Sequence, residues 1–192
     1  MPEQVNLPPI DKKRIEVPIK HLSPLIMHAW SHKAIEMMLN KQTKRATQAR
    51  EAKDPDQDYR DSMYILPDGT YGFPASAFKN AMVRAGTYTD SKMTFLRGAF
   101  YIVGDDEANS MVRIEGTPQP REDMVRVGQG TADIRYRAEF LEWKATLLVE
   151  LNARAISAEQ VINLVSVAGF SVGIGDWRPE KDGSYGRFEV VS

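Results

Sequence analysis

The chain has 192 residues, of which 42% are hydrophobic and 27% charged, a composition typical of a globular domain that can bury its own core. It has no cysteine, which excludes disulfides, thiolate metal sites and a thiol nucleophile and leads us to expect a cytoplasmic protein. No apolar run is long enough for a membrane span, and the net charge of −1 excludes recruitment to nucleic acid by overall charge, so only a local basic patch would serve.

The N-terminal segment predicts a flexible lead-in followed by a strand. Residues 1–13 are polar, contain prolines and have no hydrophobic period. Ile15, Val17 and Ile19 then alternate with polar residues, which predicts a strand over 14–20. Pro18 has no N–H to donate, which favours the edge of a sheet or the end of a strand.

An inserted arm or loop is expected over about 31–66. Residues 31–53 lack glycine and proline and have a helical composition, amphipathic in the first half and basic in the second. An acidic stretch that includes Asp54 and Asp56 follows at once. The segment is either a solvated helix with a linker, or a basic arm that lies along phosphates and uses the side chains of Lys41, Lys44 and Arg45.

A short helix is predicted over 74–85, in the sequence GFPASAFKNAMVRAG. Pro74 suits a helix start, Gly86 suits its end, and apolar residues at helical spacing form one face. Lys79 and Arg84 lie off that face. Their charges are either ordinary solvated helix charges or contacts to an anion.

Several strands are then expected, separated by loops at 104–110 and 116–123. They cover residues 99–103, 111–115, 124–127, 134–140 and 143–151. In the segment 134–140 the charged face, with Arg135 and Arg137, is expected to face solvent.

The C-terminal part predicts a helix, a glycine-rich loop and a last strand. Ser157 and Gln160 form a capping box at the helix start, and Gly169 is expected to stop the helix. The loop GFSVGIGDWRPEKDGSYG leads into the strand RFEVV. The order is that of an α+β, ferredoxin-like (RRM-like) β-α-β-β-α-β core in a single domain, 1–192, with an inserted basic helical arm and a C-terminal glycine-rich loop.

Two segments together resemble the RAMP superfamily, which holds the Cas7-, Cas5- and Cas6-like proteins of CRISPR systems. The helix GFPASAFKNAMVR resembles its "I-P-G-S-S-(L/F)-K-G-A-(L/M)-R" helix, at Pro74, Ser76, Phe78, Lys79, Ala81 and Arg84. The C-terminal loop and strand resemble its glycine-rich motif, at Gly173, Gly175, Arg178, Gly183, Gly186 and Arg187. Ala75 and Asn80 stand where the family motif has glycine. The chain is short for a Cas7 subunit, so a stand-alone, Cas7-like relative, for example one encoded by a phage, fits better than a subunit of a CRISPR complex.

The resemblance implies a non-enzymatic protein that binds single-stranded nucleic acid, RNA or DNA, and self-associates into a filament along it. In such proteins the glycine loop and the basic residues of the first helix approach the nucleic-acid backbone. Gly173 and Gly175 would let backbone amides reach a phosphate, Arg178 would fork onto one, and Trp177 would stack on a base. Alternatively, Trp177 packs on the domain and the loop only connects two elements.

Two other functions stay open. Cas6-like relatives cleave RNA with a histidine, so a small endoribonuclease would use His28 or an aspartate of the arm, Asp54 or Asp56. A structural or adaptor protein of the same fold would bind protein partners only, which the net charge favours. The three histidines lack the spacing of a metal site, and we expect no metal and no cofactor.

Overall fold

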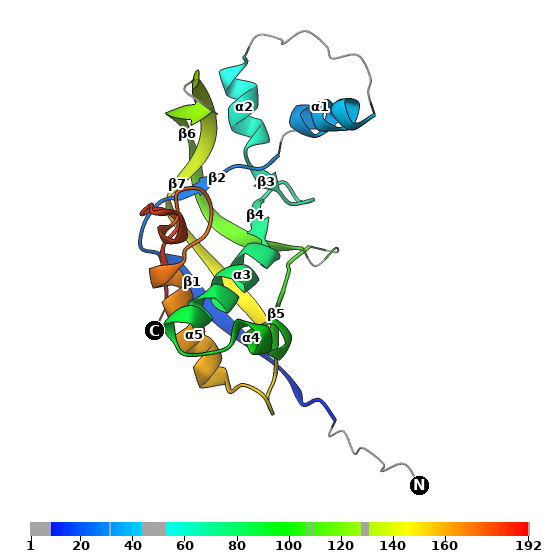
Figure 1. Ribbon diagram of the computed structural model, residues 1–192, viewed down its shortest axis with the longest axis vertical. Helices are drawn as coiled ribbons and strands as arrows, with labels where there is room; N and C mark the ends of the chain where they lie inside the picture. The colour runs from blue at the N-terminus through cyan, green and yellow to red at the C-terminus, as the bar shows by residue number, and fades with distance from the viewer. Residues whose placement is uncertain are drawn as a thin grey trace.

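The computed structural model describes residues 9–30, 32–43, 53–106, 108, 110–127 and 131–191. It is a mixed α/β structure in which a curled antiparallel sheet carries three helices on one face (Figure 1). A β-hairpin and two further helices extend from one end of the sheet (Figure 1).

Within the described ranges, eight strands form the sheet. Their path is β3-β4-β6-β7-β1-β8, and β2 and β5 also pair with β7. The strands are β1 (Lys12–His21), β2 (Leu25–Met27), β3 (Tyr64–Ile65), β4 (Tyr71–Pro74), β5 (Phe100–Val103), β6 (Met111–Val127), β7 (Thr131–Asn152) and β8 (Phe188–Val190). Every pairing is antiparallel.

The strand β7 is the axis of this sheet. One of its edges pairs with β6 and then with β5, and the other pairs with β2 and then with β1. Every second side chain from Trp143 to Leu151 is buried, as the alternating sequence predicts. The expected break between 134–140 and 143–151 does not exist, because both segments belong to this one strand.

The loop expected at 116–123 is also absent, because β6 runs through it. Beyond Ile114 this strand no longer contacts β4 and pairs with β7 alone, so Pro118 and Pro120 lie on an edge, where a missing N–H is tolerated. A register shift between Gly116 and Pro118 bends the hairpin.

The helices are α1 (His32–Gln42), α2 (Pro55–Asp61), α3 (Ala75–Ala85), α4 (Met93–Ala99) and α5 (Ala158–Ser171), with the 3₁₀ turns η1 (Gly86–Tyr88) and η2 (Pro179–Lys181). The capping box of Ser157 and Gln160 opens α5 as predicted. Helices α3 and α5 place Phe78, Val161 and their neighbours over the apolar face of β7, where Trp143 and Phe188 meet edge to face.

Gly169 does not stop α5, which continues to Ser171. Its role is close packing: a Cβ at this position would lie 2.0 Å from the carbonyl oxygen of Phe188 in β8. Pro18 is not on a sheet edge, since β1 lies between β7 and β8. The carbonyl of Pro18 accepts a hydrogen bond from the N–H of Val191, the residue just after the end of β8. The N–H that Pro18 lacks therefore falls where the neighbouring strand ends.

The helices α1 and α2 stand apart from the core (Figure 1). Ser62, which is buried, anchors the base of α2: its hydroxyl accepts from the N–H of Ala138 at 2.8 Å and its carbonyl accepts from Ala29. Lys44 and Arg45 lie outside the described residues, and Lys41 belongs to α1. None of the described helices is both long and apolar enough to cross a membrane.

Candidate nucleic-acid interface

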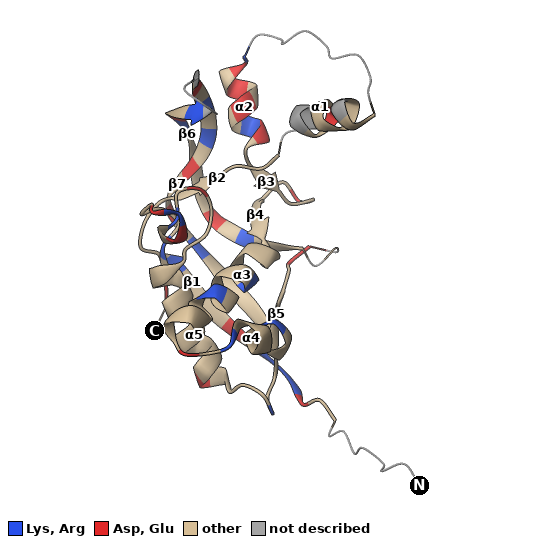
Figure 2. Cartoon of the chain, in the orientation of Figure 1, with Lys and Arg blue, Asp and Glu red and all other residues tan. Residues whose placement is uncertain are grey.

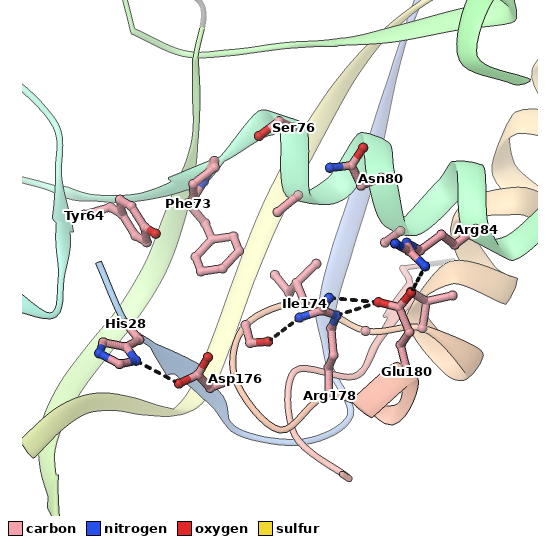
Figure 3. A pocket seen from close by; sticks show the side chains of 16 residues that line it. His28, Tyr64, Phe73, Ser76, Asn80, Arg84, Ile174, Asp176, Arg178 and Glu180 are labelled. Atoms are coloured by element: carbon pink, nitrogen blue, oxygen red, sulfur yellow. Dashed lines mark hydrogen bonds and ion pairs between the residues drawn. The ribbon is translucent and has the colours of Figure 1, made fainter. Parts of the chain in front are cut away.

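A cavity of about 360 Å³ lies between the first turns of α3 and the loop 172–178 (Figure 3). It joins the two segments that resemble the RAMP motifs, together with the end of β2. Its lining includes His28, Tyr64, Phe73, Ser76, Asn80, Arg84, Gly173, Gly175, Asp176, Arg178 and Glu180. Five candidate site residues predicted from the sequence therefore line the same cavity. They are His28, Arg84, Gly173, Gly175 and Arg178.

The wall formed by α3 presents the start of a helix. Pro74 is the N-cap and gives no side-chain cap, while Ser76, Ala77 and Asn80 line the cavity. The first N–H groups of a helix lack partners within the helix and carry its positive dipole end, which favours an anion. This wall can therefore accept a phosphate or a carboxylate.

The glycine loop forms the opposite wall. Gly173 and Gly175 have φ values of +69° and +77°, a region that favours glycine. A Cβ on Gly175 would lie 2.6 Å from the carbonyl oxygen of Ile26, and one on Gly173 would lie 2.8 Å from Pro179. Both glycines thus have a packing role, which holds the loop against β2 and gives the cavity its shape.

Glu180 pairs with both arginines of the cavity. Arg178 donates from Nε and Nη2 to Glu180 Oε2 at 3.0 and 2.8 Å, and from Nη1 to the Gly175 carbonyl at 3.1 Å. Arg84 forms an ion pair with the other carboxylate oxygen of Glu180. The Arg84 side chain is 59% exposed and that of Arg178 is 30% exposed, so Arg84 is the cation that can turn toward a ligand. Two cations share one anion, which leaves this cluster with a positive charge.

Three other predicted binding residues, Lys79, Arg187 and Trp177, do not line this cavity. Lys79 sits 3.7 Å from the centre of the Tyr101 ring and lines a second cavity of about 470 Å³; burial lowers the pKa of its ammonium group. The guanidinium of Arg187 lies 5.0 Å from the Phe170 ring centre. Lys79 and Arg84, although both on α3, therefore face different cavities.

Trp177 packs on the domain through its ring. The Arg137 and Arg121 guanidinium carbons lie 4.9 and 5.4 Å from the ring centre, and Tyr185 lies beside it at 6.0 Å. The side chain stays 38% exposed, and its backbone has a φ of +52°, a left-handed value that costs a non-glycine residue about 1 kcal/mol. The loop thus holds the indole in a fixed place at the margin of the site.

Beneath Trp177 lies a network of buried charges that the sequence did not reveal. Arg137 is 1% exposed and pairs with Asp123 at 2.6 Å and with Asp176 at 2.5 Å. Arg121 pairs with Asp123 at 2.9 Å and with Glu139 at 2.6 Å. The expectation that Arg137 faces solvent is therefore wrong, because the glycine-rich loop covers this face of the hairpin.

His28 and Asp176 connect this network to the cavity (Figure 3). His28 Nδ1 lies 3.1 Å from Asp176 Oδ2. Burial alone raises the pKa of Asp176, but the hydrogen bonds and charges of His28 and Arg137 outweigh it and hold that pKa below its ordinary value. Burial, with a contribution from the charge of Asp176, raises the pKa of the nearby Tyr64 hydroxyl. Asp176 therefore stays ionised and orients the imidazole.

The aspartates of the arm lie elsewhere. Asp54 is the N-cap of α2 and accepts from the N–H groups of Asp56 and Gln57, both at 3.1 Å. Asp56 stands in the first turn of that helix. Neither lines the described cavities, and within the described ranges no three His, Asp or Glu side chains gather as metal ligands would.

Comparisons with known proteins give only distant likenesses. No family model matches the chain, and no curated protein does. Among solved structures, the chain is similar to Cmr6 from Pyrococcus furiosus at 12% identity and a TM-score of 0.46, with 95% of this chain and 100% of that chain covered. It is also similar to a product complex of Cas6 at 11% identity and a TM-score of 0.30, with 92% of this chain and 51% of that chain covered. What the protein does must be inferred from the geometry of its own site.

Proposed function

We propose that the protein binds a single-stranded nucleic acid in the cavity between α3 and the loop 172–178, and that copies associate along the strand without cleaving it. The observation that carries this proposal is the cavity itself. It joins a helix start with two arginines, Arg84 and Arg178, which are the parts needed to hold a phosphate. Trp177, which precedes Arg178 in the chain and is 38% exposed, could stack on a neighbouring base.

We also propose that the core is ferredoxin-like and of the RAMP type. The elements β1, α3, β6, β7, α5 and β8 follow one another as β-α-β-β-α-β, and the strands lie side by side as β6-β7-β1-β8. On this view the chain is one Cas7-like domain. Residues 31–66 are then an insertion, and its basic residues Lys41, Lys44 and Arg45 contact the same nucleic-acid strand as the cavity.

A phosphate in the cavity would meet three kinds of donor. The N–H groups and the Ser76 hydroxyl at the start of α3 offer hydrogen bonds without a formal charge. Arg84 would leave Glu180 for the phosphate, because its side chain is the more exposed of the two arginines. Arg178 would stay on Glu180 and keep the loop in shape.

Labelled single-stranded RNA and DNA of matched sequence test this proposal by fluorescence anisotropy across a salt series. We expect Arg84→Gln to weaken binding about tenfold, since a charged hydrogen bond is lost, and to reduce the salt slope by about one. Arg14→Gln, which removes an equal charge from the pair with Glu150, serves as the control. No binding of either strand at low salt would contradict the proposal and favour an adaptor that binds only protein.

Glu180→Gln provides the opposite test. Because Glu180 neutralises part of the charge of Arg84 and Arg178, its removal should strengthen binding and steepen the salt dependence. Glu189→Gln removes the same charge from an exposed pair with Lys20 and should change binding little. Equal effects of the two variants would show that overall charge, and not this cluster, determines binding.

The contact between His28 and Asp176 favours one second candidate, an endoribonuclease. When Nδ1–H is donated to Asp176, Nε2 can accept the proton of a ribose 2′-hydroxyl. The 2′-oxygen then bonds to phosphorus while the bond between phosphorus and the 5′-oxygen breaks. The leaving 5′-oxygen takes a proton from water, and His28 releases the proton it accepted to solvent. If the protein is an endoribonuclease, the purified protein should shorten an RNA strand. A 2′-deoxy substitution at the cleaved position should block the cleavage, and His28→Ala should abolish it.

A further inference from the structure

Three polar side chains of α3 follow one another along the cavity between this helix and the loop 172–178 (Figure 3). Ser76, Asn80 and Arg84 are four residues apart, so they form one stripe on the helix, with a rise of about 6 Å from each to the next. Helix α3 has no acidic residue, and its only charged side chains are Lys79 and Arg84 (Figure 2). The cavity therefore meets a hydroxyl, an amide and a guanidinium in that order.

The Asn80 amide in the middle of this stripe is free to bind a ligand. The residue is exposed, and within the described ranges no hydrogen bond is formed by its side chain. Figure 3 shows this difference, since Arg84 and Arg178 are both joined to Glu180 while Asn80 is joined to nothing drawn. Asparagine also stands where the RAMP motif has glycine, so this amide belongs to this chain and does not follow from the resemblance.

The cavity has a charged end and an aromatic end (Figure 3). The two arginines and Glu180 lie at the charged end. Tyr64 and Phe73 lie at the other end, where their rings meet edge to face with centres 5.5 Å apart, and His28 lies near them. Along the chain, Phe73 comes just before α3 and the arginine of the stripe lies in its last turn, so Asn80 stands between the two ends.

The aromatic end suits a flat, apolar ring. The whole cavity of about 360 Å³ falls within the range of about 300 to 1,000 Å³ that small-ligand pockets occupy, so it can hold a base as well as a phosphate. A phosphate at the two arginines would leave its neighbouring base beside Tyr64 and Phe73. The edge of that base would then face the stripe on α3.

We infer that Asn80 reads the edge of one base of the bound strand, and that this base is adenine. The inference rests on the proposed function, which places the phosphate at the arginines. An amide offers a donor and an acceptor side by side, whereas a phosphate only accepts and would leave the amide oxygen unpaired. Adenine presents the N6 amino group beside N7, and asparagine pairs with both at once. Guanine presents two acceptors at that edge, and a pyrimidine has no N7.

The test uses one variant and one control in the full chain. Asn80→Ala removes the amide from the cavity. Asn163→Ala makes the same change at an exposed position of α5 that lines neither cavity described. Alanine is favoured over asparagine in a helix, so both variants should keep the fold, which circular dichroism checks.

Labelled strands of about ten nucleotides, short enough for one or two copies, are titrated by fluorescence anisotropy. One strand contains adenine alone, one contains uracil alone, and one contains 7-deazaadenine, in which a C–H group replaces N7. Each is made as RNA and as DNA, with thymine for uracil in the DNA. Two proteins are always compared on the same strand, which cancels differences in stacking within the strand itself.

We expect the unmodified chain to bind the adenine strand about five- to a hundredfold more tightly than the pyrimidine strand. The 7-deazaadenine strand should bind several-fold more weakly than adenine, because one hydrogen bond is lost. Asn80→Ala should weaken binding of the adenine strand about tenfold or more, leave the pyrimidine strand unchanged and remove the difference between adenine and 7-deazaadenine. Asn163→Ala should behave as the unmodified chain.

Two results would overturn the assignment of Asn80 and leave the proposed function standing. An equal loss on every strand would mean that Asn80 holds the phosphate, and a preference for adenine that persists in Asn80→Ala would mean that another group reads the base. Arg84→Gln separates the two proposals, since it should weaken all strands alike. If no strand binds at low salt, the proposed function fails, and the assignment of Asn80 fails with it.

Discussion

Five charged side chains meet on one face of the β6–β7 hairpin, under the cover of the glycine-rich loop. They are Arg121, Asp123, Arg137, Glu139 and Asp176. Arg137 and Asp123 are buried, with side chains 1% and 7% exposed, so losing one of them leaves in the other a buried charge that water does not compensate. The Nε of Arg137 already has no hydrogen-bond partner, so this arginine depends on its two carboxylates.

Replacing Asp123 by Ala should therefore lower the free energy of unfolding by about 3 kcal/mol or more, because both arginines lose a buried carboxylate. Urea unfolding followed by circular dichroism measures the change. The exposed pair of Arg14 and Glu150 is the comparison, where Arg14→Ala should cost about 1 kcal/mol or less. Equal losses in the two variants would mean that the network contributes no more than a surface ion pair.

Asp176 gives a prediction about pH. Its pKa is lower in the folded protein than in the unfolded chain, so its stabilising contribution is complete above the unfolded value of about 4 and is lost as pH falls through the lower folded value. Asp176→Asn should be less stable than the unmodified chain at pH 6, and this difference should shrink as pH falls below about 4. Unfolding midpoints at several pH values measure it, and a difference that is constant with pH would contradict the assignment.

At the scale of elements, the contacts between helix and sheet depend on a few positions where no side chain fits. Gly169 lies inside α5, against the backbone of β8, while Gly98 lies in α4 with open space around it. Both residues are in helices, where alanine is favoured over glycine by about 1 kcal/mol.

The two glycines should respond oppositely to the same substitution. Gly98→Ala should raise the free energy of unfolding by about 0.5 to 1 kcal/mol, because nothing opposes the gain in helix propensity. Gly169→Ala should lower it by about 1 to 3 kcal/mol, because the new methyl group would push β8 from the helix. Thermal unfolding compares them, and a stabilised Gly169→Ala would show that β8 can move without cost.

Of the described helices, α3 and α5 were predicted from the sequence and α1 falls in a segment of predicted helical composition, whereas α2 and α4 were not predicted. Strands β1, β5, β6, β7 and β8 were predicted in place but not in full length, and β2, β3 and β4 were not predicted. Capping residues and spacing identified α3 and α5, since those signals are local. The prolines at 118 and 120 suggested a loop because a sequence does not show that β6 is an edge strand there. Arg137 was expected in solvent for a similar reason: the loop that buries it comes from residue 176 onward and is distant in sequence.

The candidate site was predicted in part. Arg84, Arg178 and the glycines meet as the resemblance implies, and His28 joins them through the end of β2. Glu180 was missed, because its sequence context is an ordinary charged turn and only the fold brings it to Arg84. Alternating opposite charges at 121–123 and 137–139 are the one sequence signal that would have indicated the buried network.

At the scale of the whole molecule, the pairing of β7 determines which regions unfold locally first. Its second half has strands on both edges and helices over one face, whereas the hairpin tip pairs only with itself. Amide hydrogen exchange should therefore be slowest at 143–151 and faster at 124–127 and 132–135. Mass spectrometry of peptides measures it, and equal protection in the two regions would show that the hairpin and the core open together.

The pairing of the first strand with β7 has a consequence for biosynthesis. Lys12 pairs with Asn152 and Arg14 with Glu150, so β1 leaves the ribosome long before its partner has been made. Until then its apolar residues Val17 and Ile19 have no sheet to join. Such long-range pairing slows folding and exposes strand edges to aggregation. We expect the nascent chain to depend on chaperones until β7 is complete.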